Sequence, residues 1–363
     1  MLKLKPLRIV SALVVCAGAA FAQSQSAQSS DAPELGTTII TNVTNIVAPV
    51  LVTDNAGNII DNLPAQQFHL FDNNKEQNIH VDVAFEPISV VLCLEVSSRV
   101  EGIMPQLRHL GTLMPVIVGE HGEASVLAFD SRLRTVQDFT SDPDKVKAAI
   151  DKLNAGNSSS RMIDAVEKAV IMLRTRPKDN RKIILLVSET RDQASEGRVR
   201  EALIAAQLNN VFVYAVDISQ LAVRLTEKPT PPRPDPIDVT SRPGVLGNPS
   251  TPTTAAQGYG VQNQVQFAPL LQEIYKDTKR IFVDSPSEVF AKGTGGAQFS
   301  FLKQKGLEDA VQRISQEIRS QYLITYDPSN KDEPGFHQIS VTVDNGRYIA
   351  KTRPGYWIGG GKQ

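Results

Sequence analysis

Acidic and hydroxyl side chains gather in three short segments of this chain of 363 residues. The first segment is Glu-Val-Ser-Ser-Arg at residues 95–99, which directly follows an apolar run. The second, residues 157–165, opens a helical pattern, and the third, residues 188–190, again follows an apolar run. Side chains of these types bind polar or charged ligands when a fold brings them together. The elements that position them therefore decide whether they form a site.

Short apolar runs rich in β-branched residues alternate with helical patterns between residues 87 and 320. Such runs are typical of parallel strands covered on both faces, and their alternation with helices indicates right-handed crossovers. The expected strands are 88–95, 124–130, 182–188 and 211–217, with 132–139 as an edge strand. The expected helices are 100–118, 143–153, 161–174 and 196–208, with Asp142 capping the second. The sequence predicts an α/β fold with a doubly wound, mostly parallel, Rossmann-like sheet.

The three polar segments fall where such a sheet binds ligands. In an open parallel sheet, ligands bind outside the carboxyl ends of the strands. Residues 95–99 and 188–190 each follow an expected strand, and residues 157–165 lead into a helix. We therefore expect one partner-binding surface at this edge, which we call the carboxyl rim. It consists of Ser97, Ser98, Arg99, Ser160 and Glu189.

The first 22 residues have the three parts of a secretory signal. A basic start precedes an apolar run at residues 9–20 and a small-residue ending at 20–22. This pattern predicts cleavage before Gln23 and a secreted or periplasmic protein; attachment as a lipoprotein through Cys16 is the alternative. No later stretch reaches the roughly 18 uninterrupted apolar residues of a membrane span, so we expect no transmembrane segment in the mature chain.

The composition changes outside the α/β region, which we place at residues 87–320. Residues 23–35 lack large apolar side chains and predict a disordered tether. Residues 36–86 predict a small β unit, and the β segments at 321–358 are expected to pack with it as a second, smaller domain. Residues 226–264 are rich in Pro, Thr and Gly and predict a long excursion. After it we expect helices at 267–279, 287–292 and 307–320, a turn at 293–296 and a strand at 297–301.

The motifs of common enzymes are missing from the sequence. It has no phosphate-binding Walker sequence, no dinucleotide fingerprint and no Gly-x-Ser-x-Gly elbow. The five histidines lack the paired spacing of zinc sites, and Cys93 lies in an apolar run where nothing stabilises a thiolate. The net charge of −1 lacks the basic footprint of a nucleic-acid binder. We predict a protein that is not an enzyme and does not bind nucleic acid.

Taken together, the three polar segments resemble the von Willebrand factor type A family. In that family the first strand carries Asp-x-Ser-x-Ser, a Thr lies at the head of a later helix, and an Asp follows the fourth strand. These residues form the metal-ion-dependent adhesion site, in which oxygen ligands hold Mg²⁺ and an acidic group of a partner protein completes the octahedron. The resemblance implies an unidentified protein partner, and it assigns the metal-ligand positions to Glu95, Ser97, Ser160 and Glu189.

The sequence departs from the family pattern in ways that weaken metal binding. Glu95 and Glu189 replace Asp residues, and each is one methylene longer, whereas Mg²⁺ demands near-ideal geometry. Ser160 replaces the Thr, and Arg99 replaces the last Ser. A guanidinium repels a cation and offers a carboxylate a bidentate partner. Two interpretations follow: a degenerate site without a cofactor, in which Arg99 occupies the metal's place, or a site that binds Ca²⁺ or Mg²⁺ weakly.

A wider resemblance extends from about residue 38 to residue 358. It is to the von Willebrand factor type A-related proteins predicted in Acidobacteria. The segments that carry it are 52–58, 68–72, 294–296, 318–328 and 353–356. We expect these segments to serve packing and turns, so that they identify the family and leave its ligand open.

Three functions compete on this sequence. The favoured one is an exported protein-interaction or adhesion-like module that contacts a partner through the carboxyl rim. The second is a structural or scaffolding protein of the cell envelope, in which the site is vestigial and residues 226–264 or the β unit make the contacts. The third is a hydrolase, for which we expect no activity on ester or peptide substrates.

Overall fold

The structure is a computed structural model. It describes residues 45–83, 87–189, 191–219, 267, 269–272, 274, 285–300, 304–344 and 346–358. The predicted signal at 1–22, the tether at 23–35, the excursion at 226–264 and most of the predicted helix at 267–279 lie outside the described residues.

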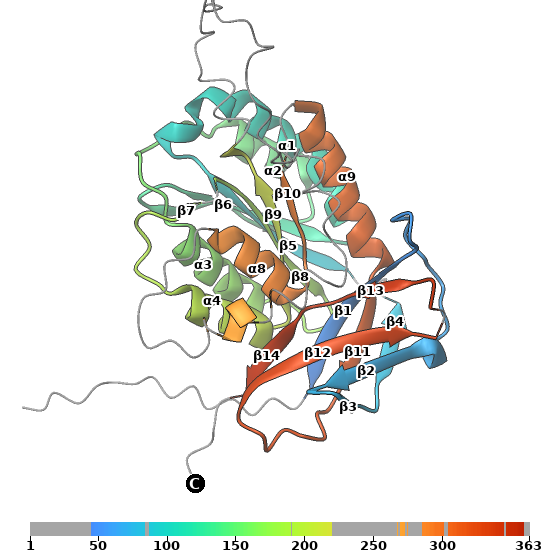
Figure 1. Cartoon of the computed structure of the whole chain (residues 1–363). Coiled ribbons are helices and arrows are strands. Elements are labelled where there is room, and N and C mark those ends of the chain that lie inside the picture. Colours follow the sequence, from blue (N-terminus) through green and yellow to red (C-terminus); the bar gives the residue numbers. More distant parts are fainter. Residues whose placement is uncertain are drawn as a thin grey trace, which may run out of the picture. The chain divides into compact units, whose positions relative to one another are not determined.

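A six-stranded sheet in the order β10-β9-β8-β5-β6-β7 forms the centre of the α/β region (Figure 1). Its strands are β5 (Ile88–Glu95), β6 (Glu123–Phe129), β7 (Leu133–Thr140), β8 (Arg181–Ser188), β9 (Val211–Asp217) and β10 (Gln298–Ser300). All neighbours pair in parallel except β6 and β7. The prediction of a mostly parallel α/β sheet with an edge strand after β6 is confirmed. The positions of β5, β8 and β9 could be predicted from the sequence because these strands are largely apolar. All their residues but one are buried.

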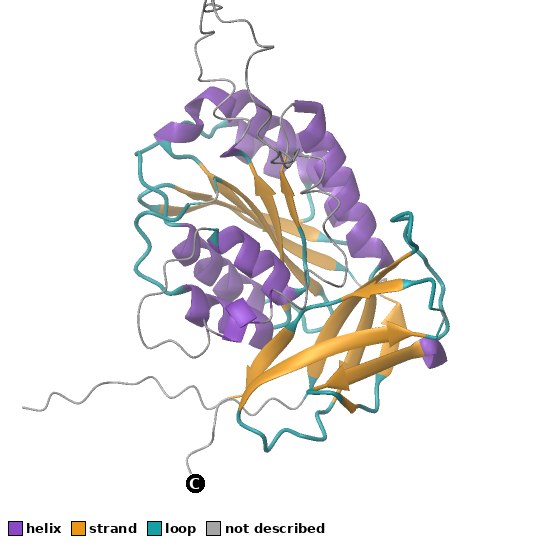
Figure 2. Cartoon of the chain, viewed as in Figure 1, coloured by secondary structure: helices purple, strands orange, loops and turns teal. Residues whose placement is uncertain are grey.

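Helices cover both faces of this sheet (Figure 2). On one face lie α1 (Met104–Val118), α2 (Pro143–Asp151) and α9 (Gln304–Ser320), and on the other α3 (Met162–Arg174), α4 (Val199–Leu208) and α8 (Pro286–Thr294). As predicted, Asp142 caps α2, because its Oδ1 accepts the N–H of Asp144 at 3.0 Å. None of the described helices is long and apolar enough to cross a membrane.

Several element boundaries differ by a few residues from those expected, and two of the differences have a clear local cause. The continuous helix predicted at 100–118 is a 3-10 segment, Ser98–Ile103, followed by α1. Pro105 lacks an N–H and so fits the first turn of α1, which sets where the α-helix begins. The turn expected at 293–296 starts late, because α8 continues through Thr294 and ends at Gly295, whose φ of 87° is the left-handed conformation that glycine adopts at helix ends.

Two four-stranded antiparallel sheets are built from the segments before and after the α/β region, and we call them together the β module. Their orders are β13-β1-β11-β4 and β14-β12-β2-β3. The strands are β1 (Ile46–Thr53), β2 (Phe68–Asp72), β3 (Lys75–Glu76), β4 (His80–Val83), β11 (Tyr322–Tyr326), β12 (Gly335–Val343), β13 (Ile349–Lys351) and β14 (Gly355–Ile358). β1 pairs with β11 and β2 with β12, and both sheets share one apolar core. The predicted fold class, with a smaller β domain from both ends of the chain, is confirmed.

The α/β region is inserted between two strands of the β module that pair with each other. β4 is the last strand before the region and β11 the first strand after it. Their antiparallel register places Val83 opposite Tyr322. The chain therefore leaves the β module and returns to it at neighbouring positions.

A buried polar cluster links the two sheets of the β module. Asp72 on β2 lies at its centre and has no exposed surface. Its Oδ2 accepts the hydroxyls of Tyr326 at 2.9 Å and Tyr356 at 2.7 Å. Its Oδ1 lies 2.7 Å from His337 Nδ1 and accepts from Asn330 at 3.1 Å. Tyr326 lies on β11 in one sheet, whereas Asp72, His337 and Tyr356 lie on strands of the other sheet. The Asp72 carboxylate therefore holds the two sheets together.

The geometry of the cluster favours a charged His337. Its Nδ1 contacts Asp72, and its Nε2 lies 2.7 Å from the carbonyl oxygen of Glu333, so both ring nitrogens face acceptors. Burial alone lowers the pKa of His337, but these two hydrogen bonds outweigh burial and raise the pKa above its ordinary value. Burial likewise raises the pKa of Asp72, and its hydrogen bonds outweigh that effect and lower the pKa. The pair is a buried imidazolium and carboxylate.

Candidate functional site

Three carboxylates follow three neighbouring strands at the carboxyl edge of the central sheet. Glu95 ends β5, Glu189 follows β8 and Asp217 ends β9, and these strands are adjacent in the order of the sheet. All three side chains belong to buried residues. Asp217 was not among the predicted site residues, although its position at the end of an expected strand matched that of Glu95.

Arg99 forms an ion pair with Glu189. Its Nη2 lies 2.7 Å from Glu189 Oε2, and the side chains are 42% and 11% exposed, respectively. The pKa of Glu189 is raised by burial, lowered by the charge of Arg99 and raised again by Asp217, with a net rise. The guanidinium of Arg99 thus neutralises the largely buried carboxylate of Glu189, while part of the arginine side chain faces solvent.

Glu95 is fully buried, and both of its carboxylate oxygens accept hydrogen bonds. Ser97 Oγ donates to Oε1 at 2.8 Å, and the backbone N–H of Glu189 donates to Oε2 at 2.9 Å. Burial raises the pKa of Glu95 to about 7, assisted by the charge of Glu189 and opposed by the two hydrogen bonds and by Arg99. At neutral pH this carboxyl is therefore divided between its protonated and ionised forms.

The two remaining residues of the carboxyl rim are held through their backbones. The N–H of the exposed Ser98 donates to the carbonyl of Asn157 at 3.0 Å. The carbonyl of Ser160 accepts from Gln193 and Ala194, at 3.0 and 3.1 Å. The buried Ser160 hydroxyl has no hydrogen-bond partner within the described residues. Hydrogen bonds and an ion pair therefore connect Glu95, Ser97, Arg99 and Glu189. Within the described residues, no side-chain contact connects Ser98 or Ser160 with this group.

The contacts of these side chains bear on the metal that the resemblance implies. A divalent cation needs carboxylate and hydroxyl oxygens free to coordinate it. Both oxygens of Glu95 already accept hydrogen bonds, and the guanidinium of Arg99 lies against Glu189 at hydrogen-bond distance. In the part of the chain that the structure describes, no group of three or more His, Cys, Asp or Glu residues is arranged to hold a metal ion. In this arrangement hydrogen bonds engage both oxygens of Glu95 and the guanidinium of Arg99 engages Glu189.

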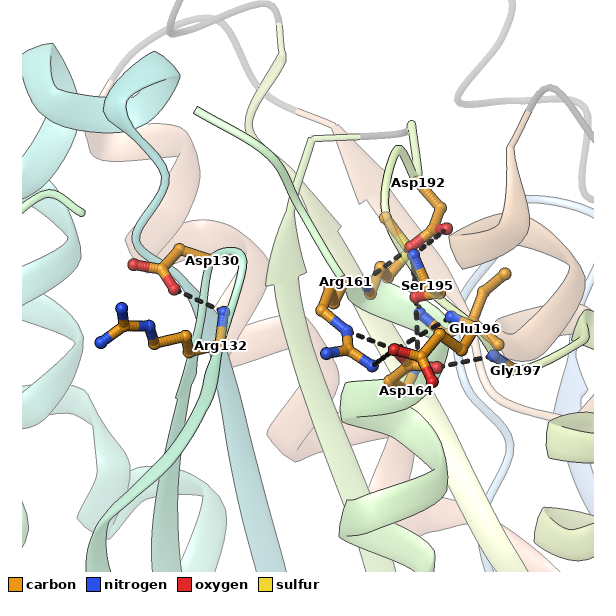
Figure 3. A network of polar contacts seen from close by, with 10 residues as sticks. Asp130, Arg132, Arg161, Asp164, Asp192, Ser195, Glu196 and Gly197 are labelled. Atoms are coloured by element: carbon orange, nitrogen blue, oxygen red, sulfur yellow. Dashed lines mark hydrogen bonds and ion pairs between the residues drawn. The ribbon is translucent and has the colours of Figure 1, made fainter. Parts of the chain in front are cut away.

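A second polar network orders the loop after β8 against the head of α3 (Figure 3). Asp192 Oδ1 accepts the N–H of Met162 at 2.7 Å, which caps the first turn of α3. Asp164 accepts the N–H of Gly197 at 2.8 Å and Arg161 Nε at 2.6 Å. The sequence predicted Asp164 at the start of a helix. Nothing in the sequence of the loop after β8 predicted that this loop would bind Asp164.

Asp130, which follows β6, joins two segments of the carboxyl edge, the β6–β7 turn and the loop between α2 and α3. It is 3% exposed, and its Oδ1 accepts the N–H of Arg132 at 2.7 Å (Figure 3). Its Oδ2 accepts the N–H of Asn157 at 3.3 Å and Arg134 Nη2 at 3.4 Å. Its carbonyl accepts the N–H of Arg161 at 3.1 Å. Through its carboxylate and its carbonyl, Asp130 therefore holds the β6–β7 turn next to the loop that carries Asn157 and Arg161.

Residues 90–191 match the family model of the von Willebrand factor type A domain. The matched range begins within β5 and ends just after Glu189, so it contains every residue of the carboxyl rim. With the parallel sheet order described above, the match supports a von Willebrand factor type A domain in this part of the chain. It does not support the narrower resemblance to proteins of Acidobacteria.

Several solved structures are similar to the chain at low sequence identity. BatB from Bacteroides thetaiotaomicron is 15% identical, with a TM-score of 0.32, over 36% of this chain and 66% of BatB. An aerotolerance-related membrane protein from Bacteroides fragilis is 14% identical, with a TM-score of 0.38, over 63% of this chain and 99% of that protein. The domain of the type V pili tip protein Mfa5 from Porphyromonas gingivalis is 17% identical, with a TM-score of 0.26, over 29% and 38%. No curated protein sequence matches the chain.

Glu95→Gln is expected to make the protein more stable than wild type at pH 8 and to change it little at pH 5. The pKa of Glu95 is raised from 4.5 to about 7, so its favourable contribution is complete below pH 4.5 and is lost as the pH rises to about 7. The stability difference between variant and wild type should change by about 2 kcal/mol between pH 5 and pH 8, as urea unfolding at the two pH values would measure.

Glu101→Gln is the control for this variant. Glu101 is an exposed carboxyl on the 3-10 segment next to the site, and its substitution should give a difference from wild type that is flat with pH. A flat difference for Glu95→Gln as well would mean that Glu95 is not the titrating group.

Proposed function

We propose that this chain is an exported protein-interaction module whose partner contacts the carboxyl rim without a bridging metal ion. The observation that carries the proposal is the ion pair between Arg99 and Glu189, which lies within the matched von Willebrand factor type A domain. Members of the family that the sequence resembles bind partner proteins at this edge of the sheet. In this chain an arginine side chain lies there, 42% exposed.

The rim supports binding without a cofactor. A metal in the family's site supplies positive charge to an acidic partner. Here the guanidinium of Arg99 supplies positive charge. Its contact with Glu189 restricts the side chain before a partner arrives, which lowers the entropic cost of binding. The site is thus degenerate with respect to metal and holds one positive side chain, which pairs with Glu189.

Export rests on the secretory pattern of residues 1–22 and on the expected cleavage before Gln23. The resemblance to proteins of Acidobacteria likewise remains a prediction, made from sequence segments alone. Neither proposal is needed for the interaction at the rim, and N-terminal sequencing of the exported protein tests the first directly.

We also propose that the chain is not an enzyme. Ser97 donates its hydroxyl proton to Glu95 within a buried pair, and burial raises the pKa of the Cys93 thiol. His337 pairs with Asp72 as a catalytic histidine would, but it is 1% exposed and its second nitrogen contacts the carbonyl of Glu333, not a serine. These surroundings support a binding function over hydrolysis.

Cross-linking of the full chain to cell-envelope extracts, read by mass spectrometry, tests the proposed function. Arg99→Glu is expected to abolish capture of the partner, because the new carboxylate would face Glu189 and reverse the charge of the rim. Capture by wild type should be equal in EDTA and in Mg²⁺ or Ca²⁺, and these ions should leave the melting temperature unchanged, since only ligands that bind the folded state raise it.

The control is Arg174→Glu, which makes the same charge change on an exposed arginine at the far end of α3. Circular dichroism melting shows whether each variant is folded. Identical capture by the two variants would favour the scaffolding function. Capture that disappears in EDTA would restore a metal-dependent site.

A further inference from the structure

The outer face of the sheet β14-β12-β2-β3 carries aromatic side chains (Figure 1). Along β12, buried residues alternate with exposed or half-buried ones, so every second side chain points away from the core. Directly opposite residues of paired strands share a face: Phe336 lies opposite Trp357, and Ser340 lies opposite Phe71. We call six residues of these strands the aromatic face: Phe71, Phe336, Gln338, Ser340, Thr342 and Trp357.

The ring of Phe336 reaches across β14. A Cβ at Gly355 would lie 2.4 Å from Phe336 Cζ and 3.0 Å from Phe336 Cε1. The ring thus occupies the space that a side chain at position 355 would take, which explains why a glycine stands there. Trp357, two residues further along β14, is the cross-strand partner of Phe336. Two half-buried aromatic residues therefore lie side by side and form a platform for stacking.

The polar side chains of the aromatic face are neutral. Gln338, Ser340 and Thr342 are exposed, and within the described residues their side chains form no hydrogen bond. An amide and a hydroxyl each donate and accept hydrogen bonds. Backbone N–H and C=O groups point along the plane of a sheet, so a ligand on this face meets side chains. The face therefore offers aromatic rings together with neutral donors and acceptors.

Charged side chains beside the aromatic face are engaged with one another. His69, which lies opposite Thr342, contacts Glu76 at 2.8 Å and Asp344 at 2.9 Å. The six residues of the face carry no charge, and the adjacent histidine is already held between two carboxylates. This surface has no cation to offer a phosphate or an acidic peptide. Charge complementarity favours an uncharged ligand.

We infer that the aromatic face binds a neutral polysaccharide. The apolar C–H faces of sugar rings match the faces of Phe336 and Trp357, and sugar hydroxyls donate and accept hydrogen bonds as Gln338 does. From Phe336 to Thr342 the face is about 20 Å long at the usual rise of an antiparallel strand, which is room for several linked sugar rings. The inference goes beyond the proposed function, because it gives the β module a ligand of its own.

Titration of the full chain with hexamers of glucose and of N-acetylglucosamine tests the inference. Trp357 is the only tryptophan of the chain, so its fluorescence reports directly on a sugar ring that stacks on the face. We expect a saturable change in emission with at least one hexamer, and a matching heat of binding by calorimetry. The affinity should depend little on salt, because no charged group takes part.

Phe336→Leu should weaken hexamer binding by about tenfold or more, because leucine keeps an apolar side chain over Gly355 but lacks the ring. Gln338→Ala removes an exposed amide and should weaken binding by about threefold. Phe139→Leu and Thr135→Ala are the matched controls on β7 of the six-stranded sheet and should bind as wild type does. Circular dichroism melting shows that each variant is folded.

Three results would overturn the inference. The first is the absence of saturable fluorescence and heat changes with both hexamers. The second is equal binding by Phe336→Leu and Phe139→Leu. The third is a labelled deca-proline peptide that binds more tightly than the hexamers and is lost in Phe336→Leu, which would make the ligand a peptide. Arg99→Glu should bind the hexamers as wild type does, so failure of this inference leaves the function proposed for the carboxyl rim intact.

Discussion

Asp72→Ala is expected to lower the free energy of unfolding by about 3–5 kcal/mol, as is typical when one partner of a buried charged pair is removed. The substitution would leave His337 charged or forced to lose its proton, and it would leave the hydroxyls of Tyr326 and Tyr356 without their acceptor inside the core. Urea unfolding followed by fluorescence measures the loss, because Trp357 on β14 is the only tryptophan of the chain and reports on the β module.

Asp344→Ala is the matched control, since it removes an aspartate that contacts another histidine of the β module. Asp344 lies 2.9 Å from His69 Nε2, but the two side chains are 58% and 38% exposed, so its loss should cost less than about 1 kcal/mol. Equal losses for the two variants would contradict a special role for the buried cluster.

The same pair sets the pH range in which the β module is most stable. The raised pKa of His337 stabilises the fold fully below pH 6.5, and this contribution is lost as the pH rises through the folded value. The lowered pKa of Asp72 stabilises the fold above pH 3.8, and this contribution is lost as the pH falls through the folded value. Asp72→Ala should therefore reduce the alkaline loss of stability that wild type shows above pH 6.5.

Gly156→Ala is expected to lower the free energy of unfolding by about 2–3 kcal/mol. A Cβ at this position would lie 1.9 Å from Asp130 Oδ2 and 3.4 Å from the carbonyl oxygen of Val96. The carboxylate cannot move freely, because it holds the N–H of Asn157 and the guanidinium of Arg134. Thermal melting measures this loss of stability.

Gly346→Ala controls for the loss of glycine itself. A Cβ at Gly346 meets nothing within 4 Å, so this variant should melt close to wild type. If Gly156→Ala melted like Gly346→Ala, the loops around Asp130 would have to be far more yielding than their contacts indicate.

The α/β region was predictable because its strands are unbroken apolar runs. The expected starts of β5, β6, β8 and β9 fall within one residue of those observed. The site followed from the same pattern, since a residue at the end of a parallel strand reaches the carboxyl edge whatever the loops do. This placed Glu95, Arg99 and Glu189 together before any contact was known, and the ion pair between Arg99 and Glu189 joins two of them.

The features that were missed depend on contacts between distant parts of the chain. β3 is two exposed residues, Lys75 and Glu76, and only its pairing with β2 makes it a strand. Asp72 looked like the polar end of a strand, and nothing near it in the sequence shows that Tyr326 and Tyr356 donate to it. Asp130 likewise ends an expected strand, and the two segments that it joins become neighbours only in the fold.

The pairing of β4 with β11 constrains the order in which the protein can be assembled. As the chain is synthesised, β1 and β2 emerge long before β11 and β12, so their hydrogen-bonding edges wait without partners. A pairing between strands so far apart in sequence is slow when the intervening chain is unfolded, because closing a long loop costs entropy. Once the α/β domain has folded, its two ends lie at the adjacent positions Val83 and Tyr322. The folded domain then holds β11 next to β4, which brings the strands synthesised late to those synthesised early. Its folding therefore determines when the β module can form.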